Sequence, residues 1–239
     1  MPYMSVADIV ENLARVRAAI AKAASEAGRH PAEVRLIAVS KTQPAAAVAA
    51  AQAVGQRDFG ENTVQDAMTK MPQFARDDIA WHFIGRLQSN KVKFIPQHFA
   101  WVHAVDSLAL LQKLARASEG AGATLNILLQ VNISADPAKQ GLTPAALAPL
   151  LDSYLRAPSP ALRLRGLMTV PALGMPPDAL RRAFADLRRL CDDTRARVGL
   201  TGFDQLSMGM SDDFAAAIAE GATMVRIGQA IFGARAKKV

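Results

Sequence analysis

The chain has 239 residues and a formal net charge of +7; 51% of its residues are hydrophobic and 5% are aromatic. This hydrophobic content argues against a disordered chain, and the single cysteine, Cys191, excludes an internal disulfide and indicates a reducing compartment. The basic residues alternate with acidic ones and lack an aromatic RNA-binding signature, so we expect no nucleic-acid binding.

The first predicted element is a helix that begins after Ser5 and ends near Gly28. Ser5 and Asp8 resemble a capping box, and apolar residues recur at helical spacing over positions 6–20. Charged residues interrupt this helix, so it is not a secretory signal. The most apolar later tract, 44–54, is shorter than the ~20 residues of a membrane helix. We therefore expect a cytoplasmic protein without membrane association.

After this helix, short apolar runs alternate with helical patterns. The runs that predict buried strands are 34–39, 58–59, 81–84, 101–105, 125–131, 162–167, 203–206 and 223–227. The clearest helix between them covers 180–191, where Cys191 belongs to a one-sided apolar stripe. Eight strands, each followed by a helical segment, favour a closed parallel barrel over an open sheet. The sequence thus predicts one domain over residues 1–239, an α/β TIM barrel of the (β/α)8 type with an extra N-terminal helix.

In such a barrel the active site lies at the carboxyl ends of the strands. Lys41 directly follows the first predicted strand. An apolar environment disfavours the charged form of a lysine, so its neutral amine becomes available to attack an aldehyde. The alternative is a lysine that only extends into solvent at a strand end.

Two glycine-containing loops follow the seventh and eighth predicted strands. Residues 207–211 are expected to open a helix, and Arg226 and Gly228 lie at the end of the last strand. These loops commonly bind phosphate in this fold, because helix N-termini attract anions and glycine permits close approach. Arg226 can add a charge-assisted hydrogen bond. The alternative is that Gly209 and Gly228 serve only turns and Ser211 only caps a helix.

A lysine and a phosphate site at the same barrel mouth predict a ligand with both an aldehyde and a phosphate. Pyridoxal 5′-phosphate (PLP) has both groups, and so do sugar phosphates bound by Schiff-base aldolases. The spacing of the residues does not separate the two. The four histidines and Cys191 show no metal-ligand spacing, and the chain has no P-loop, G-x-S-x-G or G-x-G-x-x-G motif.

Seven segments carry a family resemblance. They are 38–42 (AVSKT), 59–62 (FGEN), 81–85 (WHFIG), 87–91 (LQSNK), 165–168 (RGLM), 206–213 (LSMGMSDD) and 225–228 (VRIG), the last followed by IFG at 231–233. In these segments the chain resembles the YggS/PROSC family of pyridoxal phosphate homeostasis proteins, which is similar to the N-terminal barrel of alanine racemase. The resemblance implies a fold type III PLP-binding barrel. Thr63, where a tyrosine is common, and the missing Asp-Tyr at the C-terminus depart from the family pattern.

The resemblance also implies the cofactor and its site. PLP is expected as a Schiff base on Lys41, with a phosphate cup made by Ser211, Arg226 and Gly228. The resemblance further implies contacts near the cofactor from Asn62, His82, Met168, Ser207 and Met208. For His82 the alternative is a hydrogen bond inside the core. No catalytic residue and no metal ligand are predicted.

Two classes of function fit this cofactor. Racemisation requires a base on each face of the substrate carbanion, and alanine racemases supply the second base as a tyrosine from a C-terminal β domain. The chain ends at Val239, soon after the eighth predicted strand, and neither Tyr3 nor Tyr154 lies at a strand end. We therefore expect a monomeric, non-catalytic protein of intracellular vitamin B6 homeostasis that delivers PLP to apo-enzymes or buffers it. A PLP-dependent amino acid racemase is the alternative.

Overall fold

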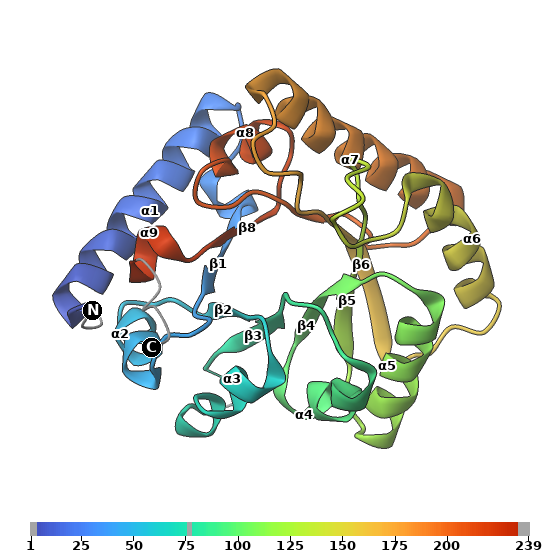
Figure 1. Cartoon of the computed structure of the whole chain (residues 1–239), viewed down its shortest axis with the longest axis horizontal. Helices are drawn as coiled ribbons and strands as arrows, with labels where there is room; N and C mark the ends of the chain where they lie inside the picture. Colours follow the sequence, from blue (N-terminus) through green and yellow to red (C-terminus); the bar gives the residue numbers. More distant parts are fainter. Residues whose placement is uncertain (1–3, 76–77, 234–239) are drawn as a thin grey trace.

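The computed structural model describes residues 4–75 and 78–233, and within these ranges eight parallel strands form a closed barrel surrounded by helices (Figure 1). The strands are β1 (Arg35–Val39), β2 (Asp58–Glu61), β3 (Ala80–Phe83), β4 (Trp101–Val105), β5 (Leu125–Gln130), β6 (Leu162–Met168), β7 (Gln205–Ser207) and β8 (Met224–Ile227). Each strand pairs with its neighbour in the sequence, and β1 pairs with β8 from Arg35↔Met224 to Ala38↔Ile227. The predicted (β/α)8 barrel is confirmed.

Most residues of the strands are buried on both faces of the sheet, which explains their largely apolar sequences. Side chains on the outer face pack against the helices, and a smaller apolar cluster fills part of the barrel interior. The interior cluster consists of Ile37, Trp101, Leu128, Met168 and Met224. The remaining interior space is occupied by hydrogen-bonded polar side chains, which are described with the site below.

The additional N-terminal helix α1 (Val6–Glu26) begins as its sequence predicts. The Asp8 backbone N–H donates to Ser5 Oγ over 3.1 Å, and Asp8 Oδ2 accepts from the Ser5 backbone N–H over 3.3 Å. The helix buries one apolar face, which includes Ile9, Leu13 and Val16, against the barrel. It contacts the helices α2 (Ala45–Ala53), α8 (Phe214–Ala219) and α9 (Gln229–Phe232), and so lies beside the seam where β8 meets β1 (Figure 1).

The short segment η1 (Pro31–Glu33) lies between α1 and β1. The other helical segments follow strands β2 to β6; they are α3 (Val64–Met68), η2 (Met71–Gln73), η3 (Ser89–Phe94), α4 (Ile95–His98), α5 (Leu108–Gly120), α6 (Pro144–Leu155) and α7 (Pro177–Val198). Cys191 is buried in the apolar face of α7, where burial raises the pKa of its thiol to about 12. None of the helices in the described ranges has the length and apolarity needed to cross a membrane.

The loop after β7 differs from its prediction. Residues 207–211 do not open a helix, because α8 begins only at Phe214 and residues 211–213 form a turn. Asp213 Oδ1 accepts a hydrogen bond from the Met210 backbone N–H and thereby closes this turn. Asp213, not Ser211, occupies the cap position of α8. Ser211 is therefore available to a ligand rather than engaged as a helix cap.

Gly166 in β6 is required by close backbone contact. Its φ is +145°, and a Cβ at this position would lie 1.9 Å from the carbonyl oxygen of Gln205 in β7. We expect Gly166→Ala to lower the free energy of unfolding by about 2–3 kcal/mol, because strands of the barrel would have to separate. Urea denaturation would measure this loss, with Gly120→Ala at the end of α5 as control, since nothing lies within 4 Å of that Cβ. Equal stabilities of the two variants would contradict the contact.

Candidate functional site

A cavity of about 290 Å³ lies at the barrel mouth formed by the carboxyl ends of the strands. Four of the nine predicted cofactor residues line it: Lys41, Ser211, Arg226 and Gly228. The wall is completed by Val39, Gln43, Ile84, Leu173, Met210, Asp212, Gln229, Phe232 and Gly233. Residues from opposite ends of the sequence meet here because β1 and β8 are neighbours in the closed barrel. The cavity therefore brings an amine, a hydroxyl and a guanidinium to one place.

Lys41 reaches the cavity from a tight turn after β1. The Gln43 N–H donates to the Ser40 carbonyl over 3.0 Å, and Thr42 has a φ of +64°, which is uncommon for a residue other than glycine. The Thr42 N–H donates to Asp66 Oδ2 over 2.7 Å. This contact holds the strained turn, and the turn directs the half-buried Lys41 side chain into the cavity.

A buried ionic cluster supports the same turn from below. Lys70 Nζ donates to Glu61 Oε1 and to the Ser40 carbonyl, each over 2.7 Å, and to Asp66 Oδ2 over 3.1 Å. Ser40 Oγ donates to Glu61 Oε1 over 2.6 Å. The side chains of Lys70 and Glu61 are 1% and 0% exposed. Lys70 and Asp66 were not predicted as site residues; their spacing of four residues, which allows an ion pair, was the available signal in the sequence.

Burial and charge act in opposite directions on the two carboxylates of this cluster. Burial raises the pKa of Glu61 to about 7, although the Lys70 ammonium and the hydrogen bonds from Lys70 and Ser40 act to lower it. Burial also acts to raise the pKa of Asp66, but the hydrogen bond from the Thr42 N–H and the nearby Lys70 outweigh it, and the net direction is down. Glu61 therefore depends on Lys70 for its charge.

Arg226 supplies a buried positive charge at the floor of the cavity. It is 4% exposed, and its guanidinium donates to Ser207 Oγ over 2.7 Å and to the Thr169 carbonyl over 2.8 Å. Burial lowers the pKa of Arg226 to about 10, while Asp213 acts to raise it. The guanidinium thus remains charged at neutral pH and keeps a fixed orientation, as recognition of an anion requires.

Glycine is needed on both sides of Arg226 for steric reasons. A Cβ at Gly228 would lie 3.1 Å from the Val39 carbonyl oxygen, where the chain passes closely over β1. Gly209 has a φ of +94°, and its carbonyl accepts from the Arg226 N–H over 2.9 Å. Gly209 thus serves the turn, whereas Gly228 leaves an open backbone surface at the cavity.

Ser207 and His82 lie below the cavity, inside the barrel. Ser207 is fully buried between Arg226 and His103, and His82 is fully buried between His103 and Asp58. His82 therefore forms hydrogen bonds inside the core, as the alternative to a cofactor contact predicts. His103 was not singled out from the sequence, because a histidine within an apolar strand gives no sign of its partners.

The three other predicted residues occupy different surroundings. Met168 packs in the interior apolar cluster, and Met208 packs in the core between the sheet and the helices. Asn62 follows β2, where its carbonyl oxygen lies so close to Gly85 that a Cβ there would be 2.1 Å from it. Asn62, Met168 and Met208 are not among the described residues that line the cavity.

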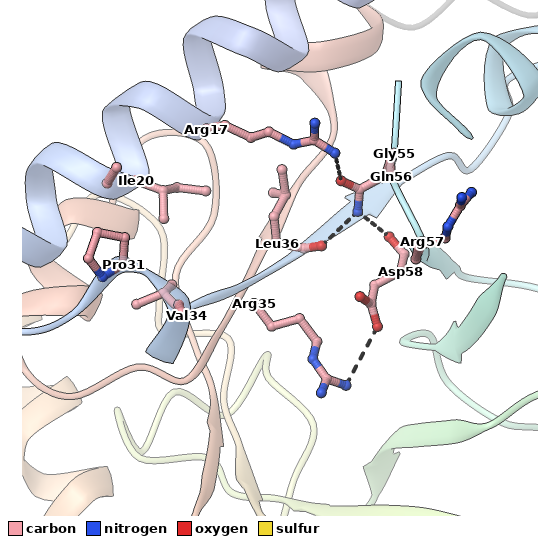
Figure 2. Close-up of a pocket in the computed structure, with 12 residues that line it drawn as sticks. Arg17, Ile20, Pro31, Val34, Arg35, Leu36, Gly55, Gln56, Arg57 and Asp58 are labelled. Carbon is pink, nitrogen blue, oxygen red and sulfur yellow. Dashed lines mark hydrogen bonds and ion pairs between the residues drawn. The ribbon is translucent and has the colours of Figure 1, made fainter. Parts of the chain in front are cut away.

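A second cavity, of about 450 Å³, lies at the opposite end of β1 and β2, against α1 (Figure 2). Arg17 donates to Gln56 Oε1 over 3.2 Å, and Arg35 pairs with Asp58 over 3.5 Å. Gln56 donates to two backbone carbonyls, those of Leu36 and Asp58 (Figure 2). These polar groups satisfy one another, and residues at this end of a barrel usually serve stability. Within the described ranges, no cluster of three or more potential metal ligands occurs at either end.

The donor set at the carboxyl-end cavity fits PLP. A primary amine that can bond an aldehyde lies on one wall, and the hydroxyl of Ser211, the open backbone at Gly228 and the buried cation Arg226 lie on another. Val39, Ile84 and Phe232 add apolar surface suited to a ring.

Comparison with known proteins agrees with the fold and with the family predicted from the sequence. Residues 12–236 match the family model "Alanine racemase, N-terminal domain". The chain is 50% identical over 227 residues to the pyridoxal phosphate homeostasis protein of Pseudomonas aeruginosa, a match that covers 95% of this chain and 96% of that protein. The corresponding protein of Escherichia coli K12 is 46% identical over 235 residues, with 95% and 97% covered.

Solved structures agree as well. PipY of Synechococcus elongatus, solved with PLP bound, is 38% identical with a TM-score of 0.81 and covers 94% of this chain and 100% of its own. Alanine racemase of Clostridium difficile is 12% identical with a TM-score of 0.71, covering 97% of this chain and 58% of its own, and shares the fold. The family resemblance is thus confirmed over nearly the whole chain, which belongs to the pyridoxal phosphate homeostasis proteins and has the barrel of the alanine racemase N-terminal domain.

Proposed function

We propose that this protein binds PLP at the carboxyl-end cavity and acts in cytoplasmic PLP homeostasis, as a monomer that delivers the cofactor to apo-enzymes or buffers it, without turning over a substrate. The observation that carries the proposal is that Lys41 and the buried cation Arg226 line the same cavity. The PLP-bound structure of PipY, a relative that matches along its whole length, supports it.

Each part of the cavity has a role in this proposal. Lys41 would hold the cofactor aldehyde as a Schiff base, a condensation with its Nζ that releases one water. Ser211, Gly228 and Arg226 bind its phosphate, where the guanidinium offers charge and the glycine offers close backbone approach. When bound, PLP supplies an electrophilic aldehyde conjugated to an electron-withdrawing ring. The apolar side chains of the wall, Val39, Ile84 and Phe232, limit access of water to the Schiff base.

The racemase alternative would use a tyrosine as its second base, and none of the described residues that line the cavity is a tyrosine. Tyr154, in α6, accepts a hydrogen bond from the Ser159 N–H over 3.2 Å and is buried away from the cavity. Burial raises the pKa of its hydroxyl, which makes the tyrosinate harder to form. Tyr3 lies outside the described residues. Tyr154 is therefore not placed to donate a proton to the face of a carbanion opposite Lys41, as racemisation in the alanine racemases requires.

The two functions are separated by following chirality. The PLP-loaded protein is incubated with L-alanine or D-alanine, and the enantiomers are quantified by chiral chromatography. We expect no sustained interconversion, whereas turnover at ordinary enzymatic rates, ~1 per second or faster, would establish the racemase alternative.

Delivery is measured by mixing the loaded protein with an apo PLP enzyme in the presence of a trap for free PLP. If the enzyme regains activity although the trap removes free PLP, the result supports delivery by direct contact. If the trap abolishes the recovery, PLP reaches the enzyme through solution and the protein acts as a buffer.

A further inference from the structure

A continuous chain of hydrogen-bonded side chains crosses the barrel interior beneath the cavity. Arg226 donates to Ser207 Oγ over 2.7 Å, and Ser207 Oγ lies 2.9 Å from His103 Nδ1. His103 Nε2 lies 2.9 Å from His82 Nδ1, and His82 Nε2 lies 2.9 Å from Asp58 Oδ1. The members come from β8, β7, β4, β3 and β2 and connect the two ends of the barrel.

The chemistry of the two ends sets the direction of every bond between them. The Asp58 carboxylate only accepts, so His82 Nε2 carries a hydrogen. In a neutral imidazole the other nitrogen then accepts, so His82 Nδ1 accepts from His103 Nε2–H, and His103 Nδ1 accepts from the hydroxyl of Ser207. Ser207 Oγ in turn accepts from Arg226, which has only donors. Each of these hydrogens takes part in one hydrogen bond, and the direction deduced from Asp58 is the same as the direction deduced from Arg226.

The direction requires that both histidines be neutral, and their surroundings favour this. Both are fully buried. Burial lowers the pKa of His82, and Arg35 acts in the same direction, while Asp58 opposes them. Burial lowers the pKa of His103 well below its ordinary value, and the neighbouring His82, Arg226 and Arg35 add to the effect. A protonated imidazole here would lie between two guanidinium groups.

The end of the chain that is remote from the cavity is held in place. The His82 ring stacks on Trp101, with centroids 5.6 Å apart and an interplanar angle of 11°. Arg35 lies 5.6 Å above the Trp101 ring and also pairs with Asp58 (Figure 2). Asp58 therefore cannot turn away from His82 without losing the pair with Arg35.

We propose that Asp58, His82, His103 and Ser207 form a one-directional hydrogen-bond chain, with both histidines protonated only on Nε2, that positions Arg226 at the cavity. Its structural part concerns the protein alone; its functional part rests on the proposed binding of PLP. His82 and His103 act as positioning residues: His103 accepts the hydroxyl hydrogen of Ser207, so Ser207 Oγ remains an acceptor for Arg226.

The structural part is tested by NMR on the native protein without cofactor. Two-bond ¹H–¹⁵N correlations of ¹⁵N-histidine-labelled protein identify the protonated nitrogen of each ring. We expect both His82 and His103 to be neutral Nε2–H tautomers at pH 7, with assignment by the single variants. An Nδ1–H tautomer or a charged ring at either position would overturn the direction of the chain.

The functional part is tested by PLP affinity. His103→Phe removes both bonds of the ring, so we expect PLP binding to weaken by about tenfold, with partial recovery in His103→Gln, whose amide can still accept and donate. Leu128→Ala, another change in the barrel interior but outside the chain, controls for general loosening and should bind as the native protein does. Native affinity in His103→Phe would overturn the positioning role.

The two failures are distinguishable. If the native protein does not bind PLP while the tautomers are as assigned, the proposed function fails and the hydrogen-bond chain stands. If PLP binds through Lys41 but the tautomers differ, the hydrogen-bond chain fails and the proposed function stands.

Discussion

Lys41→Ala is expected to abolish the covalent attachment of PLP and to leave the fold intact. The side chain is half-buried at the end of β1 and lines the cavity. Its removal deletes the amine that would bond the aldehyde, whereas Ser211, Gly228 and Arg226 remain to bind the phosphate. We therefore expect residual, non-covalent binding that is at least tenfold weaker, a loss of about 1.4 kcal/mol or more in binding free energy.

The measurement is the absorbance spectrum of the protein with PLP, before and after borohydride reduction, followed by peptide mapping. The native protein should show the Schiff-base band and a reduced adduct on the peptide that contains Lys41. Lys113→Ala, which removes an exposed lysine of α5, is the matched control and should keep both signals. An adduct that maps to another lysine in the native protein would refute the assignment of Lys41.

Lys70→Met is expected to be the most destabilising of the substitutions considered for this chain. Among the described residues, Lys70 is the only cation that forms an ion pair with Glu61. Without it, Glu61 stays fully buried beside the Lys41 turn. Glu61 Oε2 already lacks a hydrogen-bond partner within the described residues. Leaving a buried carboxylate without its counter-ion costs about 3–5 kcal/mol of unfolding free energy. The Ser40 carbonyl would also lose a donor, so the turn would loosen and PLP binding would weaken.

Chemical denaturation at several pH values checks this expectation. Burial already raises the pKa of Glu61 to about 7, and loss of Lys70 raises it further. A folded-state pKa above the unfolded value means that the folded protein binds the proton more tightly, so stability falls as pH rises from the unfolded pKa through the folded one. The deficit of Lys70→Met should therefore be smaller at pH 5 than at pH 8.

Two further variants separate the ion pair from the loss of a lysine as such. Lys22→Met breaks an exposed pair with Glu26, in which the side chains are 77% and 67% exposed, and should change the unfolding free energy by less than about 1 kcal/mol. Adding Glu61→Gln to Lys70→Met removes the unpaired charge and should restore part of the loss. If Lys70→Met alone were as stable as Lys22→Met, the buried ion pair would contribute little to the free energy of unfolding.

Four residues that line the carboxyl-end cavity could be predicted from the order of the strands in the sequence. Lys41 and Gly228 follow strands that are recognisable as short apolar runs, and the carboxyl ends of parallel strands meet at one mouth. Their convergence, together with Ser211 and Arg226, was thus predictable without knowledge of any contact. The helix expected to open at 207–211 was wrong, because the hydrogen bond between Asp213 and Met210 forms a turn that no local pattern announced.

The barrel and the strand ends that surround its mouth could be predicted from hydrophobic periodicity and strand succession, because both are local properties. Which polar groups meet inside depends on the three-dimensional fold: Lys70 pairs with Glu61, and His82 with His103 and Asp58. Such pairings depend on the stagger of neighbouring strands and on the direction of each side chain within a closed interior. A burial pattern shows that a polar residue needs a partner, but the partner is chosen by distances that exist only after the barrel has closed.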